Sequence, residues 1–351
     1  GRNIDIAYGA DFRVSAVADG AVTGRYSLAS NLNACGGVAV DMGGQKNVLE
    51  KEIAWDAAGT RITNIVYSFG TNELSYSYKY QTGADRIGRA TLPDGSWWDY
   101  SYDAFGQLTA AVQRIAVSSN TAVRLGGRYA FSYDQTGNPV AAGPVVDGSP
   151  AHSFTASADN FHSQRSWGTE VAVSGDADTN ATVSVNLVRA ERQGERFYCW
   201  APATNSLHAT NAGFTVTAVE YDASNSLDRV NTASGRVFVP KASETVSRSN
   251  NGYVTADSRW EYTWNFHRQL VRMQSKGRQP ALKLEFDYYP TGQRARKRVY
   301  VEQALQWNLL RKHQYIWDRW ALVRETVTDY EPVTPATTTK DYIWGLDLAG
   351  L

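Results

Sequence analysis

Histidine is the side chain best suited to acid–base chemistry near neutral pH, and the sequence holds 5 of them. No two stand at the spacing of a metal site, and none lies in a frame such as HExxH. They are His152, His162, His208, His267 and His313. A catalytic triad leaves no local signature, because its members can be far apart along the chain. The residues therefore give no positive sign of catalysis, and we predict no enzyme, no cofactor and no metal.

One acidic stretch begins like a calcium-binding loop, with oxygen-bearing side chains at Asp176, Asp178 and Asn180. The position that needs glycine holds Ala181, and the position of the bidentate glutamate holds Leu187. We interpret the stretch as a polar turn between two strands. Its Asn-Ala-Thr tripeptide is also a glycosylation sequon, which has meaning only in a secretory host.

The densest basic run is Arg294-Ala-Arg296-Lys-Arg298, whose side chains suit phosphate groups. On a strand, the period of two places its three arginines on one face and Lys297 on the other. Since Lys+Arg and Asp+Glu both number 35, the chain has no overall attraction to nucleic acid. We therefore expect a solvated strand face that resists stray pairing. No apolar run is long enough to span a bilayer.

Tryptophan rings at Trp97, Trp98 and Trp200 are candidates for stacking on sugars, because they are flat, apolar and carry one polar atom. The alternative is that they pack against neighbouring side chains of a sheet. Cys35 and Cys199 are too few for a disulfide framework, so we expect two unpaired thiols, with one bridge between them as the alternative.

The elements that position these residues are strands. Aromatic residues recur at every second position, as in Leu74-Ser-Tyr-Ser-Tyr-Lys-Tyr80, and this alternation places them on one face of a strand. Helical periodicity is scarce. The sequence predicts an all-β fold.

A short unit recurs in which an aromatic strand ends at aspartate and glycine follows three residues later. Aspartate accepts hydrogen bonds from the backbone just ahead, and glycine supplies the positive φ of the reversal, so each unit predicts one β-hairpin. The strict turn positions are Asp56 and Gly59, Asp103 and Gly106, and Asp134 and Gly137. Degenerate copies lie at 262–268, 286–292 and 315–321, and we expect their turns to differ in type.

Three domains are expected. Residues 1–165 form one repeat segment, 166–240 form a small β-sandwich of short alternating strands, and 241–351 form a second repeat segment. The chain opens without methionine or a leader and stops within an apolar stretch. We therefore expect a segment of a longer protein.

The repeated Tyr-x-Tyr-Asp-x-x-Gly unit resembles the YD repeats of bacterial RHS proteins, insecticidal toxin-complex subunits and animal teneurins. A later series has the order that leads into the RHS-associated core. It comprises Trp260-Glu-Tyr-Thr-Trp-Asn265, Leu270-Val-Arg-Met273, Gly292-Gln-Arg-Ala-Arg-Lys-Arg298, Tyr315-Ile-Trp-Asp318 and Tyr342-Ile-Trp-Gly-Leu-Asp-Leu348. The similarity covers roughly residues 50–145 and 250–351, and the middle segment resembles immunoglobulin-like inserts of these proteins.

The resemblance implies a curved antiparallel strip that forms part of a hollow shell. Its partners would be neighbouring repeats and an enclosed, toxin-like C-terminal polypeptide, outside or on the surface of a bacterial cell. No residue of the family's self-cleavage site can be carried over, because the chain stops before that motif. The alternative function is an extracellular adhesion module that binds glycans or proteins, or that assembles into an oligomer or fibre through its strand edges.

Overall fold

The computed structural model describes residues 5–8, 14–19, 21–28, 35–157, 160–276, 281–331 and 334–342. Within these ranges the chain forms 31 strands and no helix, and every strand pairs antiparallel to its neighbours. None of this described chain offers a helix that could cross a membrane. The all-β class that the aromatic alternation predicts is confirmed.

The first sheet has 15 strands in the order β1 to β14 followed by β22. Its strands are β1 (Asp5–Tyr8), β2 (Val14–Asp19), β3 (Val22–Leu28), β4 (Cys35–Met42), β5 (Gln45–Trp55), β6 (Ile62–Phe69), β7 (Asn72–Tyr80), β8 (Ile87–Thr91), β9 (Trp97–Tyr102), β10 (Leu108–Val117), β11 (Asn120–Tyr133), β12 (Pro139–Val146), β13 (Ser149–Ala156), β14 (His162–Ser166) and β22 (Ser243–Thr245). Because each strand pairs with the next along the chain, the sheet is one long meander of hairpins.

Between β14 and β22 the chain builds a sandwich of two sheets, in the orders β15-β19-β18 and β17-β16-β20-β21. The strands are β15 (Glu170–Asp176), β16 (Thr182–Val185), β17 (Val188–Arg189), β18 (Glu191–Gln193), β19 (Arg196–Pro202), β20 (Thr210–Asp222) and β21 (Leu227–Val239). Val183, Val185, Phe197 and Phe214 form the buried core between the sheets. Cys199 is a free thiol in this core, and the side chain of Cys35 lies outside the described residues.

The last sheet has 9 strands in chain order, β23 to β31. They are β23 (Ser247–Arg248), β24 (Val254–Ala256), β25 (Trp260–Trp264), β26 (Leu270–Ser275), β27 (Leu282–Tyr288), β28 (Arg294–Gln303), β29 (Gln306–Asp318), β30 (Ala321–Asp329) and β31 (Ala336–Asp341).

The first and last sheets meet in one stretch of chain. β22 pairs with β14, and β23, which follows after a single residue, pairs with β24. That single residue, Val246, is buried and donates its N–H to the carbonyl of Ser163 at 2.9 Å. The two sheets therefore follow one another as a single strip, and the sandwich is inserted into it.

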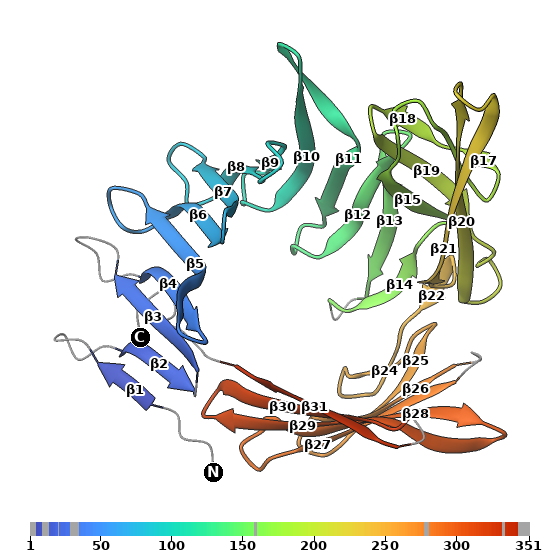
Figure 1. Cartoon of the computed structure of the whole chain (residues 1–351). Helices are drawn as coiled ribbons and strands as arrows, with labels where there is room; N and C mark the ends of the chain where they lie inside the picture. Colours follow the sequence, from blue (N-terminus) through green and yellow to red (C-terminus); the bar gives the residue numbers. More distant parts are fainter. Residues whose placement is uncertain are drawn as a thin grey trace.

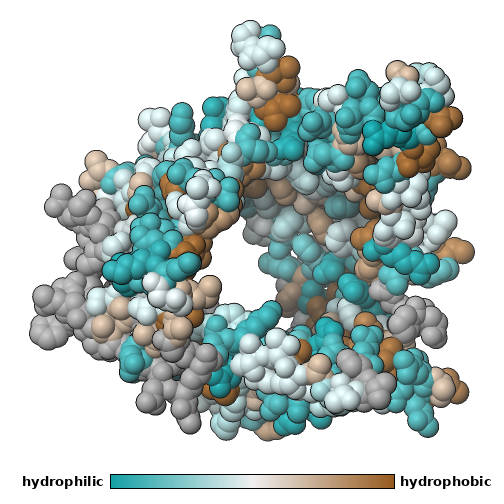
Figure 2. All heavy atoms as spheres, in the orientation of Figure 1, coloured by the Kyte–Doolittle hydropathy of each residue, from teal (hydrophilic) through white to brown (hydrophobic). Residues whose placement is uncertain are grey.

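The strip is strongly curved. In Figure 1 the first sheet arches from β1 to β14, the sandwich stands beside its end, and the last sheet runs back below. Figure 2 shows an opening in the middle of the filled molecule, bounded by the first sheet and the last sheet. The curved antiparallel strip that the resemblance implies is the architecture of the described residues outside the sandwich.

Candidate functional site

The repeated turn is best seen between β9 and β10. Oδ1 of Asp103 accepts hydrogen bonds from the N–H groups of Phe105 (2.9 Å) and Gln107 (2.8 Å). The N–H of Gly106 donates to the carbonyl of Asp103 at 3.1 Å, and Gly106 has a φ of 86°. Glycine adopts this left-handed conformation without a steric penalty. The aspartate thus holds the inner donors of the turn, and the glycine reverses the chain.

Asp134 and Gly137 form the same turn between β11 and β12. The N–H of Gly137 donates to the carbonyl of Asp134 at 3.1 Å, and Gly137 has a φ of 87°. Side-chain hydrogen bonds from Asn138 and Thr136, with backbone N–H groups, lower the pKa of Asp134 to about 2. The carboxylate is therefore charged whenever the turn is formed near neutral pH.

The turn at Asp56 and Gly59 is wider. Here the N–H of Asp56 donates to the carbonyl of Arg61 at 2.8 Å, so the loop is closed five residues on. Gly59 again has a positive φ, 69°. The backbone N–H of Thr60, followed by that of Arg61, lowers the pKa of Asp56.

Two degenerate copies form the same turn as the strict ones, so the expectation of different turn types is wrong for them. Arg268 donates its N–H to the carbonyl of Asn265 at 3.1 Å, and Gly292 donates to Tyr289 at 2.9 Å. Arg268 occupies the glycine position with a φ of 66°, a conformation that costs an arginine free energy. Only the copy at Asp318 reverses differently, through a tight turn at Arg319 and Trp320.

A second repeated contact was not predicted from the sequence. The aromatic residue at or next to the end of a strand donates its side-chain hydrogen to the carbonyl of the first residue of the preceding strand. The six donor and acceptor pairs are Tyr80 and Ile62, Tyr102 and Ile87, Tyr133 and Leu108, Trp264 and Val254, Tyr288 and Leu270, and Trp317 and Arg294, at 2.8–3.0 Å. The bond joins the end of one strand to the point where the chain leaves the previous turn, and so links consecutive units.

The three candidate sugar-stacking tryptophans do not meet. Trp97 and Trp98 are neighbours on β9 and point to opposite faces. The guanidinium of Arg89 lies 5.0 Å from the Trp97 ring centroid, and the Trp98 ring lies 5.7 Å from that of Tyr129. Trp200 lies on β19, in the sandwich. All three are half-buried and packed against protein.

The basic run does not place its three arginines on one face. Arg296 and Arg298 form ion pairs with Asp287 on β27, at 3.1 and 3.2 Å. The pairing of β27 with β28 shifts next to Asp287, and this bulge turns Arg294 to the other face. There its guanidinium lies 4.3 Å from the ring centroid of Phe286. The expected face of three solvated arginines is therefore wrong.

The sandwich is held to the strip by specific contacts. The side chain of Gln193 accepts from the N–H of Leu125 (2.8 Å) and donates to the carbonyl of Val123 (2.9 Å) on β11. The ring of Tyr198 lies where a side chain at Gly126 would stand, which explains a glycine with a φ of 73° at that point. The insert therefore has a defined orientation on the strip.

Two buried polar side chains tie the base of the sandwich. Glu244 is 5% exposed and accepts from Trp167 Nε1 at 2.7 Å and from the N–H of Ser258 at 3.0 Å. Asn205 is fully buried and donates to the carbonyls of Gly168 (2.9 Å) and Pro240 (2.8 Å). Asn205 thus joins the segments by which the chain leaves the strip and returns to it.

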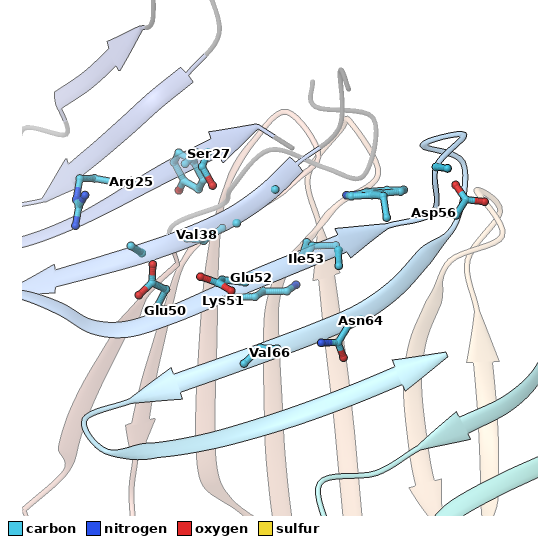
Figure 3. A pocket seen from close by; sticks show the side chains of 17 residues that line it. Arg25, Ser27, Val38, Glu50, Lys51, Glu52, Ile53, Asp56, Asn64 and Val66 are labelled. Atoms are coloured by element: carbon cyan, nitrogen blue, oxygen red, sulfur yellow. The ribbon is translucent and has the colours of Figure 1, made fainter. Parts of the chain in front are cut away.

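A hollow of about 800 Å³ lies on the strip, at β3 to β6. Figure 3 shows Arg25, Glu50, Glu52 and Asn64 along it, with Asp56 at one end. Arg25 is paired with Asp41 at 2.9 Å. The lining mixes charges of both signs and contains no histidine. In the described part of the chain, no group of histidine, cysteine and acidic residues is arranged to hold a metal ion.

Two of the described histidines, His313 and His152, contact neighbouring side chains. Nδ1 of His313 lies 2.8 Å from Oε1 of Glu325. Burial, ahead of the opposing effect of Glu325, lowers the pKa of His313, so the ring is neutral near pH 7. The His152 ring stands edge-on to Trp167, with centroids 5.0 Å apart, and burial lowers its pKa too. Residues 343–348, which belong to the last stretch that resembles the RHS-associated core, lie outside the described residues.

No family model matches the chain, and no curated protein matches it. Among solved structures, a crystal structure of TcdB2-TccC3-Cdc42 matches 91% of this chain at 14% identity and a TM-score of 0.40. One of TcdB2-TccC3-TEV matches 88% at 13% identity and a TM-score of 0.38. The chain spans 15% of the length of either. A porin-like protein from Bacteroides uniformis matches 83% of this chain, over 94% of its own length, at 9% identity and a TM-score of 0.23. With TM-scores of 0.40 or below, these matches establish neither a family nor a function.

Proposed function

We propose that this chain is a structural segment of a larger RHS/YD-repeat protein, in which the strip forms part of a shell that encloses or presents a C-terminal, toxin-like polypeptide. The observation that carries this proposal is the continuous strip, which passes from the first sheet into the last and curves around an opening. Such a curved wall is suited to surrounding another polypeptide.

The repeated contacts support a role in construction. In the turns at Asp103, Asp134 and Asn265 the side chain of that residue accepts from the backbone of its own turn, and each aromatic-to-carbonyl bond links one unit to the previous one. A unit with these two contacts can be added in series, as in repeat proteins whose units are stable only when stacked. The Asp and Gly positions are therefore structural, and we propose that this segment catalyses no reaction.

The remaining expectations belong to the same proposal. The sandwich would be an immunoglobulin-like insert of the shell, the partners would be neighbouring repeats and the enclosed polypeptide, and the protein would act outside or on the surface of a bacterial cell. The half-buried positions of Trp97, Trp98 and Trp200 give the glycan-binding alternative no particular support.

The experiment uses the full-length native gene product. Its intact mass under denaturing conditions distinguishes one chain from two fragments. The native protein is then treated with protease, and the survival of the segment C-terminal to this chain is followed by mass spectrometry. We expect that segment to resist protease in the native protein and to be digested once the shell is unfolded.

A matched pair of variants makes the test specific to the strip. Replacing both Asp103 and Asp134 by Ala weakens two turns and should expose the C-terminal segment to protease. Replacing Asp228 by Ala alters an exposed position of β21 in the sandwich, away from the turns of the strip, and should leave protection intact. A C-terminal segment digested equally fast in every native sample would contradict the enclosing role and favour an open scaffold or adhesion module.

A further inference from the structure

The two sheets of the sandwich are unequal, and the larger one is left partly uncovered. β21 is exposed from Leu227 to Val237 on both of its faces. Its partner β20 is buried at Phe214, which is opposite Gly235. No heavy atom lies within 4 Å of the place that a Cβ on Gly235 would take. We call the residues of β21 that share a face with Phe214, among them Ala233 and Gly235, the inner row of β21. This row faces open space at the place where a complete sandwich would have another strand.

The facing sheet ends at β15, whose outer edge has no strand beside it in the described part of the chain. The carbonyl of Thr169 accepts from Ala203 at 2.7 Å, and the N–H of Ala177 donates to Glu195 at 2.8 Å. Backbone groups of alternate residues point to opposite sides of a strand. The odd-numbered residues of β15 therefore bond to β19, and the N–H and C=O groups of Ala172 and Ser174 point outwards.

Two cavities lie along this edge, and each is lined by residues of both β15 and β21; together they form what we call the groove. The first, of about 220 Å³, is lined mainly by apolar residues, among them Val171, Val237 and Val239, and reaches Pro144 and His152 of the strip. The second, of about 590 Å³, is lined by Gly175, Val216 and Ala233 among others. The groove therefore continues the contact between sandwich and strip along the length of β15.

The charged groups that line the groove are mainly acidic. Asp176, Asp178 and Glu220 line its outer end together with Arg229, and Arg196 lies 4.0 Å from Asp176. Its inner end, beside the strip, carries no charged group except Glu170. An occupant of this groove needs backbone groups for β15 and small apolar side chains for the inner row of β21, and a basic side chain at its outer end would face the acidic residues there.

We propose that the groove binds an extended segment of a separate polypeptide, which pairs with β15 as an added strand. Every second side chain of that segment points inwards and covers Val216, Ala233 and Gly235. Main-chain hydrogen bonds supply affinity in this mode of recognition, and the pockets for alternate side chains supply specificity.

The probe is a fluorescein-labelled synthetic peptide of alternating valine and threonine with a lysine at each end for solubility. Its binding to the whole chain is measured by fluorescence anisotropy. The control peptide has the same composition, with N-methyl groups on alternate residues. We expect the first peptide to bind, and the N-methylated peptide to bind about tenfold more weakly or worse, since it lacks the donors that face β15.

Two variants locate the site and one serves as control. Ala172→Pro removes an outward N–H without disturbing the pairing with β19, because proline is accepted where an edge residue's N–H faces solvent. Gly235→Leu fills the open inner row. Both should weaken binding about tenfold or more, whereas Ser234→Leu, on the opposite face of β21, should not. Thermal unfolding checks that each variant is folded.

The proposal is overturned if the alternating peptide does not bind, or if binding is unchanged in both Ala172→Pro and Gly235→Leu. It is also overturned, in favour of pairing between two copies of this chain, if the protein alone forms a dimer that Ala172→Pro abolishes. Loss of binding in both variants with an unchanged Ser234→Leu supports it.

Discussion

Trp167 donates its indole hydrogen to Oε1 of Glu244 across a distance of 2.7 Å, where the strip, the sandwich and the last sheet meet. The other carboxylate oxygen, Oε2, accepts from the N–H of Ser258. Nη1 of Arg165 lies 3.6 Å from Oε1. One carboxylate thus joins three parts of the chain, and its loss should affect all of them.

We expect Glu244→Gln to lower the free energy of unfolding by about 1–3 kcal/mol, because a buried charged acceptor is replaced by an amide that places a donor beside the Ser258 N–H or the indole. Urea unfolding provides the measurement. Glu261→Gln, at an exposed position of β25, is the control and should change the stability little. Equal effects of the two substitutions would contradict the role assigned to Glu244.

The turn at Asp134 predicts a dependence of stability on pH. Its pKa in the folded protein is about 2, lowered from 3.8. A lowered folded pKa contributes stability that is fully present above the unfolded value and is lost as the pH falls through the folded value. The free energy of unfolding of the wild type should therefore decline between pH 3.8 and about 2 more steeply than that of Asp134→Asn.

Asparagine keeps an acceptor oxygen at this position but has no charge to lose. Because Asp41, Asp56 and Asp94 also have lowered pKa values, the quantity to examine is the difference between the two pH curves. A difference that stays constant across this range would show that Asp134 does not contribute.

The hydroxyl of Tyr133 tests the bond between units. Tyr133→Phe should destabilise the chain by about 0.5–1.5 kcal/mol, since the carbonyl of Leu108 loses its 3.0 Å donor and little else changes. Thermal or urea unfolding measures the effect. Tyr221→Phe, at a residue that is 63% exposed, is the matched removal of a hydroxyl and should be neutral.

Arg268 offers a test in which stability rises. Arg268→Gly should stabilise the chain by about 0.5–1 kcal/mol, because glycine adopts the φ of 66° that arginine adopts at a cost. Its exposed neighbour Phe266 should show no comparable gain on replacement by glycine. A lower stability of Arg268→Gly would mean that contacts of the arginine outweigh the backbone strain.

Replacing the glycine of a strict turn by a larger residue should lower the stability. Gly106→Val places a β-branched residue at a φ of 86° and directs its Cβ into the guanidinium of Arg86. We expect a loss of about 1 kcal/mol or more, measured by thermal unfolding. An unchanged midpoint would contradict the role of glycine in this turn.

The fold class could be predicted from the sequence because alternation is a local pattern, as in the aromatic residues of β7. What could not be predicted depends on register. The bulge beside Asp287 moves Arg294 to the other face of β28, and no residue type marks it. Likewise, the bond from Tyr133 to Leu108 depends on which residues two strands place side by side.

The turn at Asn265 shows a second reason why the structure could not be fully predicted from the sequence. Its sequence keeps an acceptor at Asn265 but has arginine in place of glycine, so the local preference at Arg268 disfavours the strict turn. The pairing of β25 with β26 nevertheless imposes it, and Arg268 adopts the left-handed conformation that results. Tertiary structure outweighs a local cost of about 1 kcal/mol here, which a reading of single residues does not anticipate.

β14 and β22 are hydrogen-bonded neighbours, so the chain leaves the strip and returns to it at adjacent points. To the strip, the whole sandwich is one long hairpin loop. Because the entropic cost of a closed loop grows only slowly with its length, we expect this position to tolerate inserted segments of very different lengths. The same junction can therefore accept another module, or none, while the strands on either side keep their register.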